Sequence, residues 1–137
     1  MDFLLHSRLA SDTVFIADWP LCRVLLMNDQ RFAWIILVPR RTDVSDIFDL
    51  DEASRSLLTG EIARAAERLK LWAKARGPCD KINIGMIGNV VPQLHVHVVA
   101  RAKTDAAWPG TVWGMGTAIP YAAPELSRVA AELRDRL

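Results

Sequence analysis

The residues best suited to chemistry form the run Gln93-Leu94-His95-Val96-His97-Val98-Val99. Successive side chains of a β-strand point to opposite faces, so a strand here places Gln93, His95 and His97 on one face. Imidazole is the side chain that titrates nearest to neutral pH, and it acts as a base, an acid, a metal ligand or a nucleophile. Two histidines on one strand face therefore indicate a candidate reaction centre.

Two other interpretations of the paired histidines stay open at this point. A zinc site needs at least a third ligand, and His6, the one other histidine of the chain, lies on a predicted N-terminal helix. No cysteine or carboxylate is placed near the pair by the sequence. Alternatively, both histidines are partly buried, hydrogen-bonded residues with a structural role.

Length and composition describe one domain, residues 1–137, with 51% hydrophobic and 24% charged residues. The formal net charge of +1 gives no electrostatic argument for nucleic acid or an anionic membrane as a partner. The longest apolar run, Ala33 to Val38, is too short to span a bilayer. Cys22 and Cys79 show no metal-type pairing and no signal peptide is visible, so we expect free thiols in a cytoplasmic protein.

Hydrophobic periodicity predicts the elements that position the histidines. The predicted strands are Thr13 to Ala17, Cys22 to Met27, Ala33 to Pro39, Lys81 to Ile87 and about 93–100. The predicted helices are 2–11, 52–76 and Pro124 to Leu137. Short turns separate the first three strands, which favours an antiparallel meander. The third strand is apolar almost throughout, so we expect it to be central and buried on both faces.

Residues 52–76 are the clearest predicted helix, because their apolar residues form one stripe. The stripe consists of Leu58, Ile62, Ala65, Leu69 and Trp72. Asp51 is a suitable N-cap, Gly77-Pro78 ends the helix, and Glu61 is expected on its solvated face. The order of elements predicts an α+β domain: an antiparallel sheet of about five strands, with the long helix across one face and a C-terminal helix.

The histidine run and its surroundings resemble the histidine triad (HIT) superfamily of nucleotide hydrolases and transferases. The signature of that family is His-φ-His-φ-His-φ-φ, where φ is apolar, and this chain is similar to a bacterial-type HIT protein with Gln93 at the first triad position. Other matching segments follow in family order from about residue 12 to 115. They are Met27-Asn28, Trp34 to Arg40, Asp49 to Glu52, Gly88-Asn89, Arg101 and Trp108-Pro109-Gly110.

The resemblance implies an activity and a set of site residues. His95 would attack the α-phosphorus of a nucleotide and form a covalent nucleotidyl-imidazole, which water or another acceptor resolves. His97 would hydrogen-bond the phosphate or the leaving-group oxygen. Asn28 would bind the ribose hydroxyls, Asn89 would donate to the phosphate or bridging oxygen, and Asn83 would be a polar contact nearby. The implied substrate is a purine nucleotide or another nucleotide phosphate. We expect no cofactor and assign no residue to a metal site, and the sequence leaves open whether a divalent metal assists by chelating polyphosphate. A homodimer is also implied, because relatives pair through the long helix and neighbouring strands.

Gln93 departs from the family pattern and is placed with His95 and His97 among the expected catalytic residues. Glutamine donates and accepts hydrogen bonds but cannot take up a proton. It suffices if the first position only orients its neighbours, and it slows or alters the reaction if that position transfers a proton. Thr42 stands where some relatives have a further active-site histidine. The alternative function is therefore a nucleotide-binding or sensing module with weak or no catalysis.

Several of these residues also have an ordinary structural explanation. Asn28 and the Gly88-Asn89 pair are common in turns for backbone reasons alone. Arg101 can cap the exposed end of the histidine strand. Trp108 and Trp113 are expected to be core or interface aromatics in preference to stacking on a base.

Overall fold

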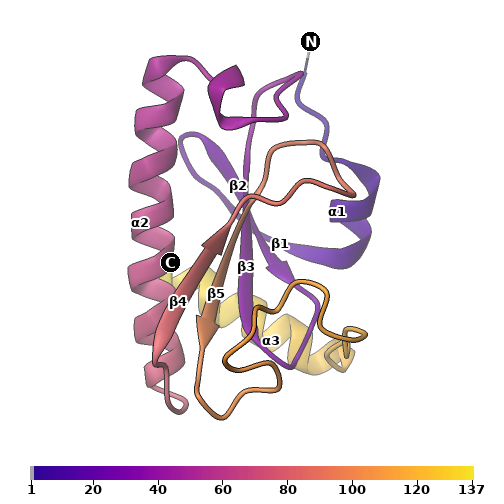
Figure 1. Ribbon diagram of the computed structural model, residues 1–137, viewed down its shortest axis with the longest axis vertical. Helices are drawn as coiled ribbons and strands as arrows, with labels where there is room; N and C mark the ends of the chain where they lie inside the picture. Colours follow the sequence, from indigo (N-terminus) through magenta and orange to yellow (C-terminus); the bar gives the residue numbers. More distant parts are fainter. Residues whose placement is uncertain (1) are drawn as a thin grey trace.

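The computed structural model describes residues 2–137; Met1, the first residue of the expected domain, lies outside the described residues. The strands are β1 (Thr13–Asp18), β2 (Cys22–Met27), β3 (Ala33–Pro39), β4 (Lys81–Gly85) and β5 (Val96–Arg101). The helices are α1 (Ser7–Asp12), the short 3-10 helix η1 (Ile47–Asp49), α2 (Glu52–Lys74) and α3 (Ala123–Arg136). Figure 1 shows their arrangement, with α2 running along the sheet. Among residues 2–137, no helix combines the length and apolar character needed to cross a membrane.

The strands form one antiparallel sheet in the order β1-β2-β3-β5-β4. The predicted meander of the first three strands is confirmed, and β3 is buried along nearly its whole length at the centre of the sheet. The predicted α+β class is confirmed as well. β5 lies between β3 and β4, so the histidine strand has a partner on each side.

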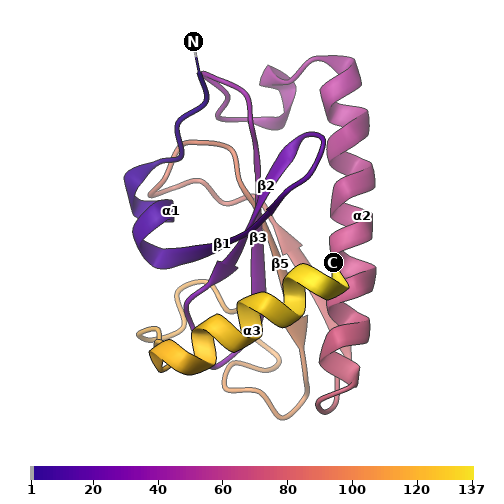
Figure 2. The same ribbon diagram turned by 180° about the vertical axis from the view of Figure 1, so that it is seen from behind.

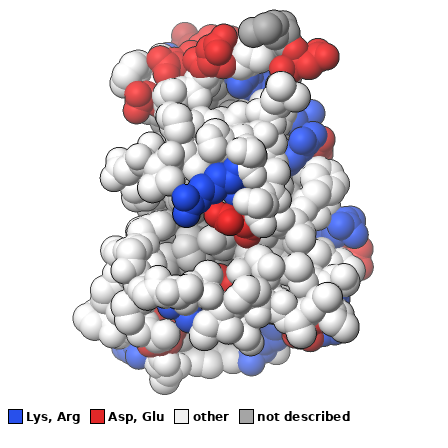
Figure 3. Space-filling view, turned by 90° about the vertical axis from the view of Figure 1, so that its right-hand side faces the viewer, with Lys and Arg blue, Asp and Glu red and all other residues white. Residues whose placement is uncertain are grey.

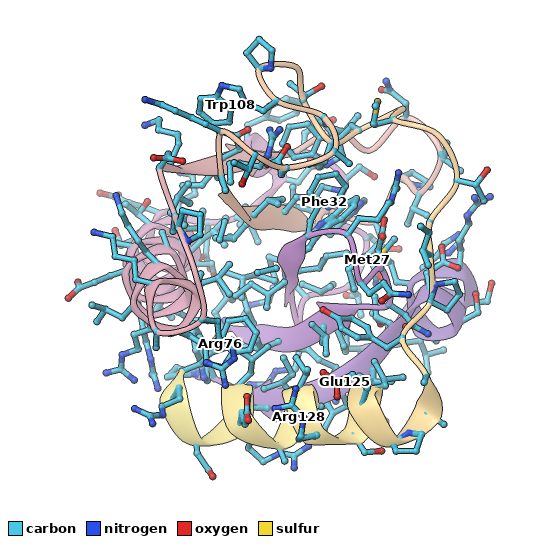
Figure 4. The ribbon with its side chains drawn as sticks, turned by 90° about the horizontal axis from the view of Figure 1, so that it is seen from below. Met27, Phe32, Arg76, Trp108, Glu125 and Arg128 are labelled. Atoms are coloured by element: carbon cyan, nitrogen blue, oxygen red, sulfur yellow. The ribbon has the colours of Figure 1, made fainter. Side chains whose placement is uncertain are left out.

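Alternation along β5 sends its side chains to two different layers. Val96 and Val98 join the core formed with Leu58 and Leu69 of α2 and with Leu133 of α3. His97 points to the opposite face, which α1 and the loops after β4 and β5 cover. Figure 2 shows α2 and α3 on one face, and Figure 4 shows α3 and the loop of Trp108 on opposite sides of the sheet. The two valines therefore anchor β5 in the core, and the opposite face, which carries His97, can form a functional site.

The α2 prediction is confirmed at its start, the helix ends at Lys74 and not at residue 76, and the expected exposure of Glu61 is wrong. Asp51 is the N-cap, and its carboxylate accepts a hydrogen bond from the backbone N–H of Ser54 at 2.7 Å. Glu61, expected in solvent, is 6% exposed, and its two oxygens accept from the N–H groups of Leu21 and Cys22, each at 2.8 Å. The turn before β2 leaves these N–H groups without strand partners, and a buried carboxylate satisfies both.

The histidine strand begins at Val96 and not at residue 93 as predicted. Its ladder with β3 extends from Leu37 toward Ala33, and Pro39 at the other end of β3 has no N–H to donate. The N–H of Leu94 instead donates to Val44 of the neighbouring loop at 2.9 Å. His95 therefore lies in the extended segment that enters β5, directly beside its first residue. β4 likewise ends at Gly85, its last residue paired with β5, and not at the predicted Ile87.

Arg101 does not cap an exposed strand end, because its side chain is 2% exposed. Its guanidinium donates to both carboxylate oxygens of Asp105 at 2.7 and 3.0 Å, to Asn83 Oδ1 at 2.8 Å and to the carbonyl of Gly110 at 2.8 Å. Burial alone raises the pKa of Asp105, but Arg101 and backbone N–H groups outweigh burial and lower this pKa to about 2. The ion pair thus fastens the loop after β5 to the sheet.

Candidate active site

His95 and His97 lie side by side on the sheet face opposite α2. They are 6% and 8% exposed, and their ring centroids are 4.9 Å apart at an interplanar angle of 70°. Both rings line a cavity of about 560 Å³, which we call the larger cavity. Its walls come from α1, the β2–β3 turn, the segment after β4 and residues 112–118. Figure 3 views this face and shows a hollow next to one basic and one acidic side chain.

The backbone fixes the tautomer of His95. Its Nδ1 lies 2.7 Å from the carbonyl oxygen of Gln93. A carbonyl oxygen only accepts, so Nδ1 carries the proton and Nε2 carries the lone pair. No described residue hydrogen-bonds this Nε2. The nitrogen is therefore available for attack on a bound electrophile, which is the arrangement that nucleophilic catalysis requires.

Trp34 fixes the opposite tautomer in His97. The indole Nε1–H donates to Nδ1 of His97 at 3.0 Å, so the ring proton of neutral His97 is on Nε2. Burial, with a further contribution from the charge of His95, lowers the pKa of His97 to about 4. At neutral pH His97 is therefore an uncharged hydrogen-bond donor. The pair combines one nucleophilic nitrogen and one N–H donor, which together suit a phosphate group.

The role of Trp34 gives a testable prediction. Replacing Trp34 with phenylalanine removes a donor that stabilises only the neutral ring, so the pKa of His97 should rise by about one unit toward its ordinary value. The chemical shifts of the His97 ring, followed by NMR from pH 3 to 8, measure this change. The other titratable groups that line the same cavity are His95, Arg8 and Asp12 of α1, and Asp29 and Arg31 of the β2–β3 turn.

Trp113→Phe is the matched control for Trp34→Phe. The Trp113 ring packs against His97 with centroids 5.6 Å apart, but its Nε1 is buried without a partner among the described residues. The control should therefore leave the pKa of His97 nearly unchanged. Equal shifts in the two variants would show that burial alone, and not the Trp34 hydrogen bond, controls this pKa.

His95 also lines a second cavity, of about 380 Å³, on its other side. The polar residues of this second cavity are Ser45 and Asp46, from the loop between β3 and α2. The two cavities share Ile87, Gly88 and His95. Gly88 has a φ of +67°, which glycine adopts without the strain that a side chain brings. Figure 3 shows acidic side chains gathered at the end of the molecule where the N-terminus and this loop lie.

The three asparagines expected in the site are placed differently. Asn89 lines the larger cavity with an exposed side chain. Asn28 Oδ1 accepts from the N–H of Tyr121 at 2.9 Å, and Asn83 Oδ1 accepts from Arg101. Neither Asn28 nor Asn83 lines a cavity that reaches His95. The structure thus brings Asn89 together with the histidines and gives the other two asparagines backbone or side-chain partners elsewhere.

Several cavity residues were missed by sequence reasoning. Trp34 could have been found, because strand alternation within Ala33–Pro39 puts Trp34 and Ile36 on one face and β3 pairs with the histidine strand. Trp113 packs against the core as expected, and it also forms a half-buried wall of the cavity, which was not expected. Asp29 is fully buried and binds Arg31 through both carboxylate oxygens at 3.0 and 2.8 Å. No local pattern in the sequence distinguishes this pair, in which Asp29 is buried, from an ordinary polar turn.

Gln93 contributes to the site through its backbone. Its carbonyl holds His95, whereas its side chain lines a separate cavity that includes His6 and Thr42. The side-chain amide bonds to the backbone of Leu4 and His6. These bonds replace helical ones, which explains why α1 begins at Ser7 and not at residue 2 as predicted. Among residues 2–137, no group of three or more His, Cys, Asp and Glu side chains is arranged to hold a metal ion.

The fold and the paired histidines match what the HIT resemblance implies, and comparison with known proteins agrees. The HIT domain model matches residues 8–104, and because this is more than half of the chain, the protein belongs to the HIT domain family. No curated protein matches the chain significantly.

Solved structures of whole HIT proteins align over nearly the full chain. A histidine triad protein from Bradyrhizobium japonicum is 45% identical, with a TM-score of 0.92 over 99% of this chain and 98% of that one. One from Sinorhizobium meliloti is 45% identical, with a TM-score of 0.91 over 98% and 97%. One from Marinobacter aquaeolei is 39% identical, with a TM-score of 0.94 over 100% and 97%.

Proposed function

We propose that this HIT protein is a nucleotide hydrolase or nucleotidyl transferase that acts at the α-phosphate through a covalent intermediate on His95. One observation carries the proposal: the unpaired Nε2 of His95 and the Nε2–H of His97 adjoin one cavity, with tautomers set by Gln93 and Trp34. A volume of about 560 Å³ is within the range of small-molecule sites. The substrate would be a purine nucleotide or another nucleotide phosphate, and no cofactor is part of the proposal.

The proposed reaction has two steps. The lone pair of His95 Nε2 attacks the α-phosphorus, a P–N bond forms, and the bond to the leaving group breaks with its electron pair on the leaving group. The resulting imidazolium is stabilised by its Nδ1–H bond to the Gln93 carbonyl, and His97 donates to a phosphate oxygen. Water or another acceptor then attacks phosphorus and forms a P–O bond, while the P–N bond breaks with its electron pair on His95 Nε2. The acceptor loses its proton to solvent, and His95 is neutral again.

The two cavities suggest where each part of the substrate lies. We assign the nucleoside to the larger cavity and the leaving group and acceptor to the second cavity, since His95 borders both. Asn89, which lines the larger cavity, would donate to the phosphate. Asn83 would act by holding Arg101, and a ribose contact from Asn28 requires its bond to Tyr121 to be exchanged for one to the ligand.

Turnover and binding measured together test this proposal against the alternative, a binding or sensing module. The purified protein is offered adenosine phosphoramidate, a dinucleoside polyphosphate and a nucleotide sugar, and products are separated by chromatography. Nucleotide binding is measured by calorimetry in parallel. Product release supports the enzyme. Tight binding with no product from any of the three supports the module, and an absence of both contradicts each function.

We further propose a homodimer in the cytoplasm. Cys22 and Cys79 are both free and buried, as expected in a reducing compartment. Apolar side chains are exposed along the open edge strand β4 and the segment that follows it. They are Ile84, Met86, Ile87 and Val90, exposed by 47%, 39%, 44% and 69%. A second copy of the chain would bury these side chains and pair with the free edge of the strand.

The dimer proposal predicts a particle of twice 15.3 kDa in light scattering at micromolar concentration. Ile84→Lys should shift the mass to that of one chain, because a charge at the centre of the interface is costly to bury. Phe15→Lys, on the opposite edge strand β1, is the matched control and should leave the mass unchanged. A native protein that scatters as a single chain overturns the dimer.

A further inference from the structure

The side chain of Gln93 joins the N-terminal arm, residues 2–6, to the segment that carries His95. Its Oε1 accepts from the N–H of His6 and its Nε2 donates to the carbonyl of Leu4, both at 2.8 Å. Leu4 itself is 82% exposed, whereas Phe3 and Leu5 pack partly buried against the core on the histidine face. Apolar packing thus holds the side chains of the arm, and the two bonds to Gln93 fix its backbone next to His95.

The chemistry of a primary amide suits this attachment. Its acceptor and donor lie at the same end of the side chain, and they bind an N–H and a C=O two residues apart, as a strand residue does in a parallel ladder. The two nitrogens of an imidazole diverge, so a histidine at position 93 cannot make both bonds in this way. An amide also does not titrate, so the attachment persists at any pH at which the protein is folded.

The attachment fixes one wall of the larger cavity. His6 is the N-cap of α1: its Nδ1 accepts from the N–H of Arg8 at 3.1 Å, and its carbonyl accepts from the N–H of Ala10 at 3.0 Å. Arg8, Leu9 and Asp12 of this helix line the larger cavity. Holding His6 therefore holds the start of α1, while Thr13 holds its end through a bond to the carbonyl of Leu9 at 2.6 Å.

We propose that Gln93 is a positioning residue that acts through two separate groups. Its carbonyl orients the nucleophile His95. Its side chain holds α1 against the bound nucleotide and so sets nucleotide affinity, and we call this attachment the clamp. This inference rests on the proposed function, because it assigns the larger cavity to the nucleoside. In this proposal Gln93, which stands in place of the first triad histidine, acts in nucleotide binding and not in proton transfer.

The clamp predicts a split between kinetic constants. Gln93→Ala removes the side chain and keeps the carbonyl, so KM for adenosine phosphoramidate and Kd for AMP should rise about 10-fold. The turnover number kcat should change less than about 2-fold, and its pH profile should not change. Gln30→Ala, which removes the other glutamine of the chain from an exposed turn, is the control and should alter neither constant.

A double-mutant cycle in the full-length chain locates the effect in the arm. His6→Pro removes the N–H that Gln93 binds, and the φ of −55° at His6 is compatible with proline. His6→Pro should raise KM as Gln93→Ala does, and the double variant should be no worse than either single one. His6→Ala keeps this N–H and loses only the side-chain cap, so its effect on KM should be smaller.

The outcomes of these experiments distinguish a failure of the clamp from a failure of the proposed function. If the native protein binds and turns over nucleotide but Gln93→Ala lowers kcat at constant KM, the side chain acts in the chemical step and the clamp is wrong. Additive effects of Gln93→Ala and His6→Pro overturn it too. A native protein that neither binds AMP nor yields product contradicts the proposed function, and the nucleotide-positioning role with it.

Discussion

Replacing His95 with alanine should lower kcat by at least about 10,000-fold, with little change in KM. The variant loses the nitrogen that would form the P–N bond, while the other residues lining the larger cavity stay in place. Steady-state kinetics on adenosine phosphoramidate measure the loss. A variant with kcat within about 10-fold of the native value would show that His95 is not the nucleophile.

The same pair of proteins reports the intermediate directly. Native protein is mixed with adenosine phosphoramidate and quenched in mild alkali, where a phosphohistidine bond survives, and the intact mass is measured. We expect a nucleotidyl adduct on the native protein and none on His95→Ala, with fragmentation assigning the added mass to position 95. An adduct located on His97 would show that His97 is the nucleophile, and it would contradict the roles inferred from the two tautomers. Unchanged unfolding of His95→Ala in urea shows that its loss is chemical and not structural.

Replacing Arg101 with alanine should lower the free energy of unfolding by about 3–5 kcal/mol. The guanidinium is almost completely buried and makes bonds to Asp105, Asn83 and Gly110. Its removal leaves the Asp105 carboxylate with backbone N–H donors alone, and it takes the guanidinium donor away from the other two acceptors. The desolvation cost of these unpaired acceptors dominates the effect. Urea unfolding followed by tryptophan fluorescence measures the change.

Arg128→Ala is the control for Arg101→Ala. Arg128 has two acidic partners, Glu125 and Glu132, but its side chain is 53% exposed. Figure 4 shows Arg128 and Glu125 together on α3. An exposed pair contributes about 0–1 kcal/mol, so this variant should be nearly as stable as the native protein. Equal losses in the two variants would contradict the assignment of the Arg101 effect to burial.

The Arg101–Asp105 pair also predicts how stability depends on pH. Asp105 has a pKa of about 2 in the folded protein and an ordinary, higher value when unfolded. Its contribution of about 2 kcal/mol is therefore present above pH 4 and is lost as the pH falls from about 4 to 2. In Arg101→Ala this loss should be smaller, because the folded-state pKa of Asp105 is no longer lowered by the guanidinium.

Much of the fold was predictable because it depends on local patterns. The bounds of β2 and β3 were predicted correctly, since their apolar runs end at turn residues and at Pro39. The α2 stripe and the Asp51 cap were correct for the same reason, as helical spacing and capping are properties of neighbouring residues. The sequence also predicts that His97 points away from the core, because the two valines that flank it on the strand point into the core.

The errors arose where a polar side chain has a distant partner. Glu61 and Arg101 look solvent-exposed in the sequence, because nothing nearby shows that each meets backbone or carboxylate groups in the core. The bonds of Gln93 cross 87 and 89 positions of the chain to His6 and Leu4. Such pairs depend on how the elements pack, which local periodicity does not encode.

The meeting of two cavities at His95 has a consequence for divergence among proteins of this kind. Apart from Ile87, Gly88 and His95, the cavities are lined by different residues, and Ser45 and Asp46 line only the second one. If the proposed function holds, substitutions at Ser45 or Asp46 can therefore change which acceptor is tolerated without altering the wall that α1 forms around the proposed nucleoside site. Evolution could then exchange one half of the proposed substrate while the other half and the reacting nitrogen of His95 are retained.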